Sequence, residues 1–209
     1  MLPRRLSGIV SKTLFWPTLP ITASKRIGKW TIVLGGAPIG FLGFPEKLKE
    51  EYNVNAVINL CEEYRGPVKQ WRKLGVEEMY LPTTDHFEPS QEDLLSALSF
   101  IKRHEAMGNR VYVHCRAGHG RSGAVAFAWM MMQHPDADPE QLNVDLCRVR
   151  NVRKSLWKQP NIQALHKRFR NTGGSFVNVK DIFFQQGQQQ EQQQQEAASH
   201  DDQEIKKDL

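Results

Sequence analysis

A cysteine and an arginine six residues apart have the spacing for phosphate chemistry in the segment "VYVHCRAGHGRSGAVAF", residues 111–127. A thiolate at Cys115 is a nucleophile, and the planar fork of Arg121 matches two oxygens of a phosphoryl group. The hydroxyl of Ser122 can donate a hydrogen bond to that thiolate. Glycines between them let consecutive backbone N–H groups turn toward an anion. The predicted phosphate-binding residues are Arg116, Ala117, Gly118, His119, Gly120 and Arg121.

The segments on either side of this loop predict how it is positioned. Residues 110–114 are β-branched and aromatic, which indicates a strand, and residues 122–134 are apolar on every side, which indicates a buried helix. Ligands of open α/β sheets bind at the carboxyl ends of the strands, where a helix N-terminus attracts anions. The same positive surroundings stabilise a thiolate, so Cys115 is predicted to be the nucleophile.

Cleavage of a phosphate ester also needs a proton for the leaving oxygen, and a loop carboxylic acid commonly supplies it. The loop predicted at 82–89 offers Asp85 and Glu88. We expect Asp85 to be the general acid, with Glu88 as the alternative.

The rest of the chain alternates strands with helices. Besides 110–114, strands are predicted at 30–38, 54–60 and 76–81. Helices are predicted at 44–53, 66–75 and 122–134, after Ser90, after Asp138-Pro139, and around Ile162, Leu165 and Phe169. This order predicts an α/β domain over 30–172, with a central, mostly parallel sheet flanked by helices.

Charge is unevenly distributed along the 209 residues, whose net charge is +5. Residues 1–45 and 146–180 contain no Asp or Glu, so anionic partners are favoured. We expect several basic side chains of the second run to lie on the face that carries Cys115, from among Arg148, Arg150, Arg153, Lys154 and Lys158. Residues 1–29 are predicted to be a basic targeting or membrane-anchoring segment, and the glutamine-rich residues 173–209 a disordered tail.

His114, Cys115, Arg121 and Ser122 meet the pattern H-C-x5-R-S/T, so the chain resembles the cysteine-dependent phosphatases of the dual-specificity branch. The resemblance implies that fold, a phosphocysteine intermediate, and no metal or other cofactor. It also implies the acid, because Asp85 lies where these enzymes carry theirs.

Further segments resemble the mitochondrial phosphatidylglycerophosphate phosphatases: "LFWPTLPIT" (14–22), "LGGAP" (34–38), "EEY" (62–64), "WRKLGVEE" (71–78) and "LPTTD" (81–85). This resemblance implies an anionic phospholipid substrate, peripheral contact with an anionic membrane, and a mitochondrial inner-membrane address. The "EEY" segment matches in position, but its residue types alone assign it no role.

Three other functions compete with a lipid phosphatase. A dual-specificity protein phosphatase would use the same loop on phosphotyrosine and phosphoserine or phosphothreonine. A nucleic-acid 5′-phosphatase is not expected, because no basic groove interleaved with aromatic residues is evident. A non-catalytic phosphate-binding module conflicts with the intact set of Cys115, Arg121, Ser122 and a candidate acid.

Overall fold

A four-stranded parallel sheet lies at the centre of the computed structural model, which describes residues 31–175. The strands are β1 (Ile32–Gly35), β2 (Val54–Cys61), β3 (Glu77–Thr83) and β4 (Arg110–His114), in the order β1-β4-β2-β3. All three pairings are parallel, and Val113 of β4 lies opposite Leu34 on one side and Ile58 on the other. The predicted parallel α/β sheet is confirmed, with β4 in its interior.

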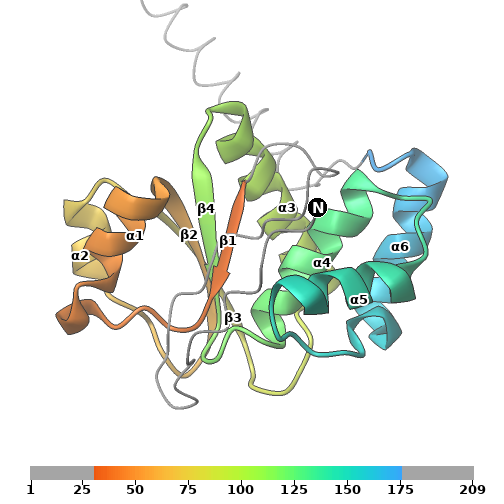
Figure 1. The fold of residues 1–209 in the computed structure, drawn as a ribbon, viewed down its shortest axis with the longest axis horizontal. Coiled ribbons are helices and arrows are strands. Elements are labelled where there is room, and N and C mark those ends of the chain that lie inside the picture. Colours follow the sequence, from red (N-terminus) through yellow and green to blue (C-terminus); the bar gives the residue numbers. More distant parts are fainter. Residues whose placement is uncertain (1–30, 176–209) are drawn as a thin grey trace, which may run out of the picture.

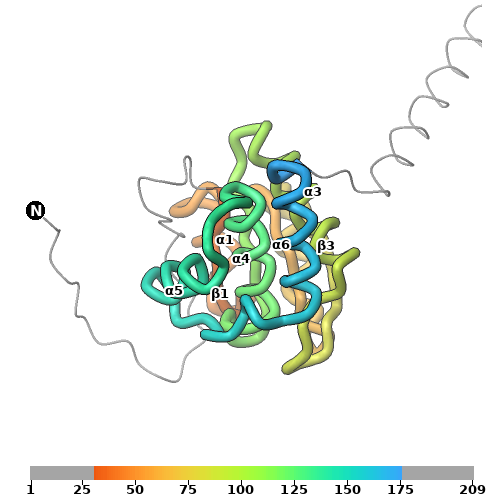
Figure 2. Tube along the Cα trace, turned by 90° about the vertical axis from the view of Figure 1, so that its right-hand side faces the viewer, coloured from red at the N-terminus to blue at the C-terminus, as the bar shows by residue number. Residues whose placement is uncertain are grey.

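Helices cover both faces of the sheet (Figure 1). On one face lie α1 (Phe44–Tyr52) and α2 (Val68–Lys73). On the other lie α3 (Gln91–Ala106), α4 (Arg121–Gln133), α5 (Pro139–Val149) and α6 (Pro160–Thr172), which Figure 2 views from the front. Two short 3₁₀ turns, η1 (Gly40–Leu42) and η2 (Leu156–Lys158), were not expected from the sequence.

The core has two parts because alternate strand residues point to opposite faces. In β4, Val111 and Val113 pack in the larger cluster with α3, α4 and α6, whereas Tyr112 packs with Trp71 and Leu48 under α1 and α2. All residues of α4 from Arg121 to Met132 are buried, which confirms the predicted core helix. Because α4 is packed in the core on every side, its N-terminus is held in place, and so is the loop that leads into it.

Two predicted helix starts are confirmed by side-chain caps. The Ser90 hydroxyl accepts a hydrogen bond from the Asp93 N–H at 3.0 Å. The Asp138 carboxylate accepts one from the Gln141 N–H at 3.0 Å. Each cap satisfies an N–H group that has no partner within its helix.

One strand boundary agrees with the prediction and another differs. Strand β1 ends at Gly35, in the glycine turn predicted within 30–38, and the Ala37 N–H donates to the Arg116 carbonyl at 3.0 Å. Strand β3 runs on to Thr83, which pairs with Cys61, so the loop that carries Asp85 begins at Thr84 rather than at 82.

The limits predicted for the phosphatase domain, 30–172, remain a prediction. Residues 1–29 and the tail beyond 175 lie outside the described residues. Within 31–175, no helix combines the length and apolar character that a membrane crossing requires.

Candidate active site

The loop from Cys115 to Gly120 joins the carboxyl end of β4 to the first turn of α4. The Cys115 side chain is buried, with its Sγ 3.2 Å from the Ser122 Oγ. The backbone N–H of Gly118 donates to the same sulfur at 3.3 Å. The predicted nucleophile therefore lies within hydrogen-bonding distance of the Ser122 hydroxyl and the Gly118 N–H.

Gly118 is essential to the shape of this loop. Its φ is 76°, in the left-handed region, and a Cβ there would lie 2.4 Å from the Gly35 carbonyl oxygen. Any other residue would therefore clash with the end of β1 as well as strain the backbone.

The carbonyl groups of the loop bond to partners outside it. The Arg150 guanidinium donates to the carbonyls of Gly118 at 2.8 Å and Ala117 at 3.1 Å. The Arg153 N–H donates to the His119 carbonyl at 2.9 Å. With its carbonyls held outward, the loop directs its N–H groups inward, which is the arrangement of an anion-binding nest.

The Arg121 guanidinium is 3% exposed and is held from several sides. Its Nη1 donates to the Thr83 carbonyl at 2.8 Å, at the end of β3. Both terminal nitrogens also donate to the Glu63 carboxylate, each at 2.7 Å. The Glu63 carboxylate and burial act in opposite directions on Arg121; the carboxylate prevails and raises its pKa, so the residue keeps its charge.

Glu63 is the residue that the sequence reasoning missed. The hydrogen bonds from Arg121 lower the pKa of Glu63 from 4.5 to about 2, so it is a carboxylate at any ordinary assay pH. One signal was available in the sequence. Glu63 lies two residues past the end of β2, the neighbour of β4, and the carboxyl ends of parallel strands meet at one edge of a sheet.

The structure separates the two candidate acids. The Asp85 Oδ1 lies 2.8 Å from Nη2 of Arg121, so a phosphoryl group bound at Arg121 would be within reach of this carboxyl. Glu88 instead accepts from the Asn161 N–H, with both oxygens at 3.2 Å, in the first turn of α6. The geometry favours Asp85 as the acid and gives Glu88 a capping role.

The basic residues of the 146–180 run have different surroundings. Arg150 is bound to the loop carbonyls, and Arg148 pairs with Asp145 at 2.7 Å. The Lys158 ammonium lies 4.9 Å from the centre of the Trp157 ring. Lys154 is exposed, as is Arg116 in the catalytic loop. The Arg150 side chain therefore stabilises the catalytic loop from outside, and membrane contact through this run stays a prediction.

Burial disfavours the charged forms of other titratable groups near the loop. Burial lowers the pKa of His114 from 6.5 to about 3 and also lowers the pKa of His119. For Cys61, burial raises the thiol pKa to about 12. Among residues 31–175, no group of His, Cys, Asp or Glu side chains has an arrangement suited to a metal ion.

Comparison with known proteins gives consistent results. Residues 42–161 match the dual specificity phosphatase catalytic domain. The human phosphatidylglycerophosphatase and protein-tyrosine phosphatase 1 is 30% identical over 164 residues, which cover 70% of this chain and 80% of that protein. The phosphatidylglycerophosphate phosphatase PTPMT1 of Arabidopsis thaliana is 31% identical over 147 residues, which cover 66% of this chain and 43% of that protein.

A solved structure is also similar. The crystal structure of PTPMT1 superposes with a TM-score of 0.60 at 29% identity, covering 68% of this chain and 94% of that one. A second structure of PTPMT1 was solved in complex with PI(5)P and has the same TM-score, 0.60.

The parallel sheet and the cysteine loop before α4 define a cysteine-dependent phosphatase. The chain belongs to the dual specificity phosphatase family.

Proposed function

We propose that this phosphatase removes the terminal phosphate of phosphatidylglycerophosphate and releases phosphatidylglycerol, a step on the route to cardiolipin. The proposal is supported by the human and Arabidopsis relatives, whose names give this activity. The complex of PTPMT1 with PI(5)P adds that a similar protein binds a phospholipid with a phosphorylated headgroup.

In the proposed first step, the Cys115 thiolate attacks phosphorus in line with the leaving oxygen. The S–P bond forms as the P–O bond breaks, and Asp85 gives its proton to the departing alcohol. Arg121 and the N–H groups of residues 116–121 bind the phosphoryl oxygens, and Glu63 holds the guanidinium in position.

In the second step, water attacks the phosphocysteine and the S–P bond breaks. The Asp85 carboxylate accepts the proton of the attacking water. Ser122, 3.2 Å from the sulfur, donates a hydrogen bond to the departing thiolate.

The observation that carries this mechanism is the placement of Ser122 and the Gly118 N–H around one buried sulfur, in the loop that the buried Arg121 closes. Cys115→Ser should therefore lower kcat by about a thousandfold or more, because an alkoxide is not available at neutral pH. Binding of vanadate, a phosphate analogue, should survive in this variant. Turnover of p-nitrophenyl phosphate near the wild-type rate would refute the mechanism.

The lipid substrate is tested separately from the chemistry. We expect a higher kcat/KM on phosphatidylglycerophosphate in anionic vesicles than on phosphotyrosine peptides, and a lipid rate that falls as salt screens the surface charge. Each Lys or Arg near an anionic bilayer contributes on the order of 1 kcal/mol to membrane binding. Arg116 and Lys154 are exposed and are the candidates for this contact. A peptide preference that persists with vesicles present would favour the alternative, a protein phosphatase, which the second half of the human relative's name supports.

We further propose a mitochondrial location, at the inner membrane, for the whole protein. The basic, acid-free residues 1–29 are of the kind that direct proteins there. A fluorescent fusion of the full chain should localise to mitochondria, and removal of residues 1–29 should leave it diffuse.

A further inference from the structure

Exposed apolar side chains are concentrated at the edge of the sheet that carries the catalytic loop. Within residues 31–175, the large apolar side chains with high exposure are Phe41 at 89%, Phe87 at 68%, Met107 at 54%, Leu42 at 46% and Val144 at 41%. Phe41 and Leu42 follow β1, and Phe87 follows β3, so these three lie past the carboxyl ends of strands. Met107 precedes β4, at the opposite edge.

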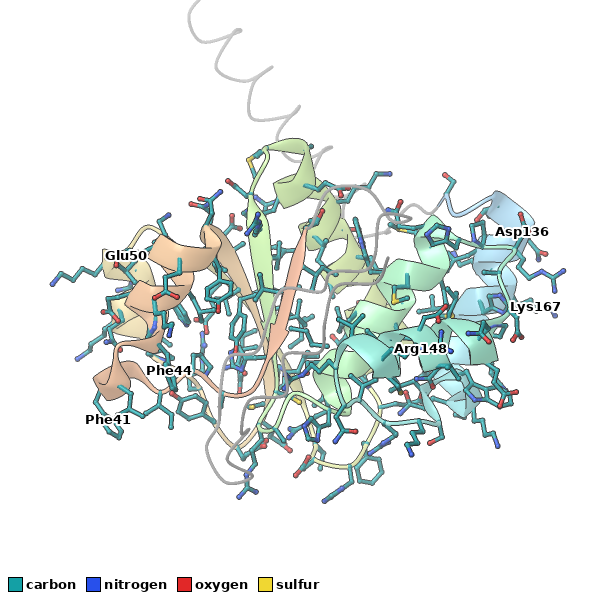
Figure 3. All side chains as sticks on the ribbon, viewed as in Figure 1. Phe41, Phe44, Glu50, Asp136, Arg148 and Lys167 are labelled. Atoms are coloured by element: carbon teal, nitrogen blue, oxygen red, sulfur yellow. The ribbon has the colours of Figure 1, made fainter. Side chains whose placement is uncertain are left out.

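Phe41 and Phe87 lie on opposite sides of Cys115. Strands β1 and β3 are the two outer strands of the sheet, and β4 lies between them. The carbonyl of Gly40, next to Phe41, accepts from Gln70 of α2 on one face of the sheet, whereas the carbonyl of His86, next to Phe87, accepts from Arg153, which follows α5 on the other face. Figure 3 shows Phe41 at the lower left of the molecule, on the side of α1 and α2 and toward the end to which the β1 arrow points.

Two exposed cations lie in or beside the catalytic loop at the same edge. Arg116 is exposed within the catalytic loop itself. Lys154 is also exposed, and its neighbour Arg153 bonds to the His119 carbonyl at 2.9 Å, which places Lys154 beside the loop. Aromatic rings around a basic centre match the boundary of an anionic bilayer, where rings enter the acyl region and cations meet headgroups.

The burial of Cys115 makes such an approach necessary. Its side chain is 3% exposed, at the bottom of the loop, so a phosphate carried by a lipid reaches it only if this edge faces the bilayer closely. Two aromatic contacts on opposite sides of the loop would also prevent the protein from tilting away from the surface.

We propose that Phe41 and Phe87 insert into the surface of an anionic bilayer on either side of Cys115 and hold the catalytic loop against the headgroups. This inference rests on the proposed lipid substrate and adds the residues that dock the enzyme. Leu42, beside Phe41, extends the inserted surface.

The test measures the partitioning of the full-length protein onto vesicles of phosphatidylcholine and phosphatidylglycerol, by sedimentation at low and high salt. Phe41→Ala and Phe87→Ala should each weaken partitioning about fivefold to tenfold, and the double variant about fiftyfold. The loss should persist at high salt, because screening removes the attraction of cations but not the transfer of apolar area. Met107→Ala is the matched control, since it removes an exposed apolar side chain from the opposite edge, and it should bind like the wild type.

Further variants at the same positions test whether misfolding causes the loss of vesicle binding. Phe41→Trp and Phe87→Trp keep an aromatic ring and should retain binding, whereas Phe→Asp at either position should abolish it at unchanged thermal midpoint. Equal binding by the wild type and the double alanine variant would overturn the proposal. So would a wild-type protein that self-associates without lipid and loses that association in the double variant, because the surface would then bind a second copy.

The result of the vesicle-binding experiment does not depend on the proposed substrate. These vesicles contain no phosphomonoester, so binding is measured without turnover. A protein that binds them through Phe41 and Phe87 but leaves phosphatidylglycerophosphate intact would refute the substrate and keep the docking surface. Hydrolysis of phosphatidylglycerophosphate, added to such vesicles, at the wild-type rate by the double variant would instead refute the docking surface and keep the substrate.

Discussion

At the residue scale, the central interaction is the pairing of Arg121 with Glu63. A guanidinium that is 3% exposed loses most of its hydration, and removing one partner of such a pair leaves an uncompensated charge. The two hydrogen bonds of 2.7 Å compensate for that loss and fix the plane of the fork. Glu63 therefore acts as a positioning residue for phosphate binding.

Replacement of Glu63 by glutamine should test this role. We expect Glu63→Gln to lower kcat/KM on p-nitrophenyl phosphate about tenfold to a hundredfold, because a neutral amide holds the fork less firmly. Glu63 has a pKa of about 2 and does not titrate above pH 4. The pH profiles of the wild type and of this variant should therefore have the same shape above pH 4. Glu62→Gln changes the exposed neighbour and should have the wild-type rate.

The acid can be identified from the leaving group. Asp85→Asn should slow alkyl phosphates much more than p-nitrophenyl phosphate, because a poor leaving group needs the proton most. Glu88→Gln should lower thermal stability, because it weakens the contact with α6. It should leave the ratio of the rates on alkyl phosphates and p-nitrophenyl phosphate close to that of the wild type. Equal losses on both substrates in Asp85→Asn would assign the proton to another group.

At the scale of elements, the segment after α5 shapes the catalytic loop from outside. Arg150→Met removes the bonds to the Ala117 and Gly118 carbonyls and should lower kcat/KM on p-nitrophenyl phosphate about tenfold to a hundredfold. Arg148→Met removes an equal charge from an exposed side chain paired with Asp145, and it should leave that rate unchanged. If the two variants lose activity equally, net charge rather than loop geometry explains the effect.

At the scale of the whole molecule, His114 couples folding to pH. It has a pKa of about 3 in the folded protein because burial disfavours its charged form, and a pKa of 6.5 in an unfolded chain. Between these values the unfolded state binds a proton that the folded state does not, so stability falls as pH falls below 6.5. From pH 7 to 5 this group alone should lower the free energy of unfolding by about 2 kcal/mol.

Urea unfolding of the wild type and of His114→Asn at pH 7 and 5 measures this coupling. The wild type should lose more stability across the interval, because carboxylates contribute alike to both proteins. Equal losses in the two proteins would show that His114 is protonated at the same pH in the folded and unfolded states.

The elements and the centre of the site could be predicted from the sequence by itself. Alternation along residues 110–114 and the apolar run of 122–134 depend on local periodicity, and so predicted β4, α4 and the loop between them. The spacing of Cys115, Arg121 and Ser122 is also local, because one turn of chain brings them together. The caps at Ser90 and Asp138 follow for the same reason.

The tertiary structure decided which distant residues complete the site. Glu63 is 58 residues from Arg121, and Arg150 is 32 residues from Gly118. These contacts depend on the strand order β1-β4-β2-β3 and on the return of the chain after α5, neither of which periodicity encodes. The sequence around a charged residue looks the same whether its side chain is solvated or bonded to a buried loop. Only the packing of the sheet and helices therefore made Glu63 and Arg150 part of the catalytic loop's support and placed Phe41 and Phe87 on either side of Cys115.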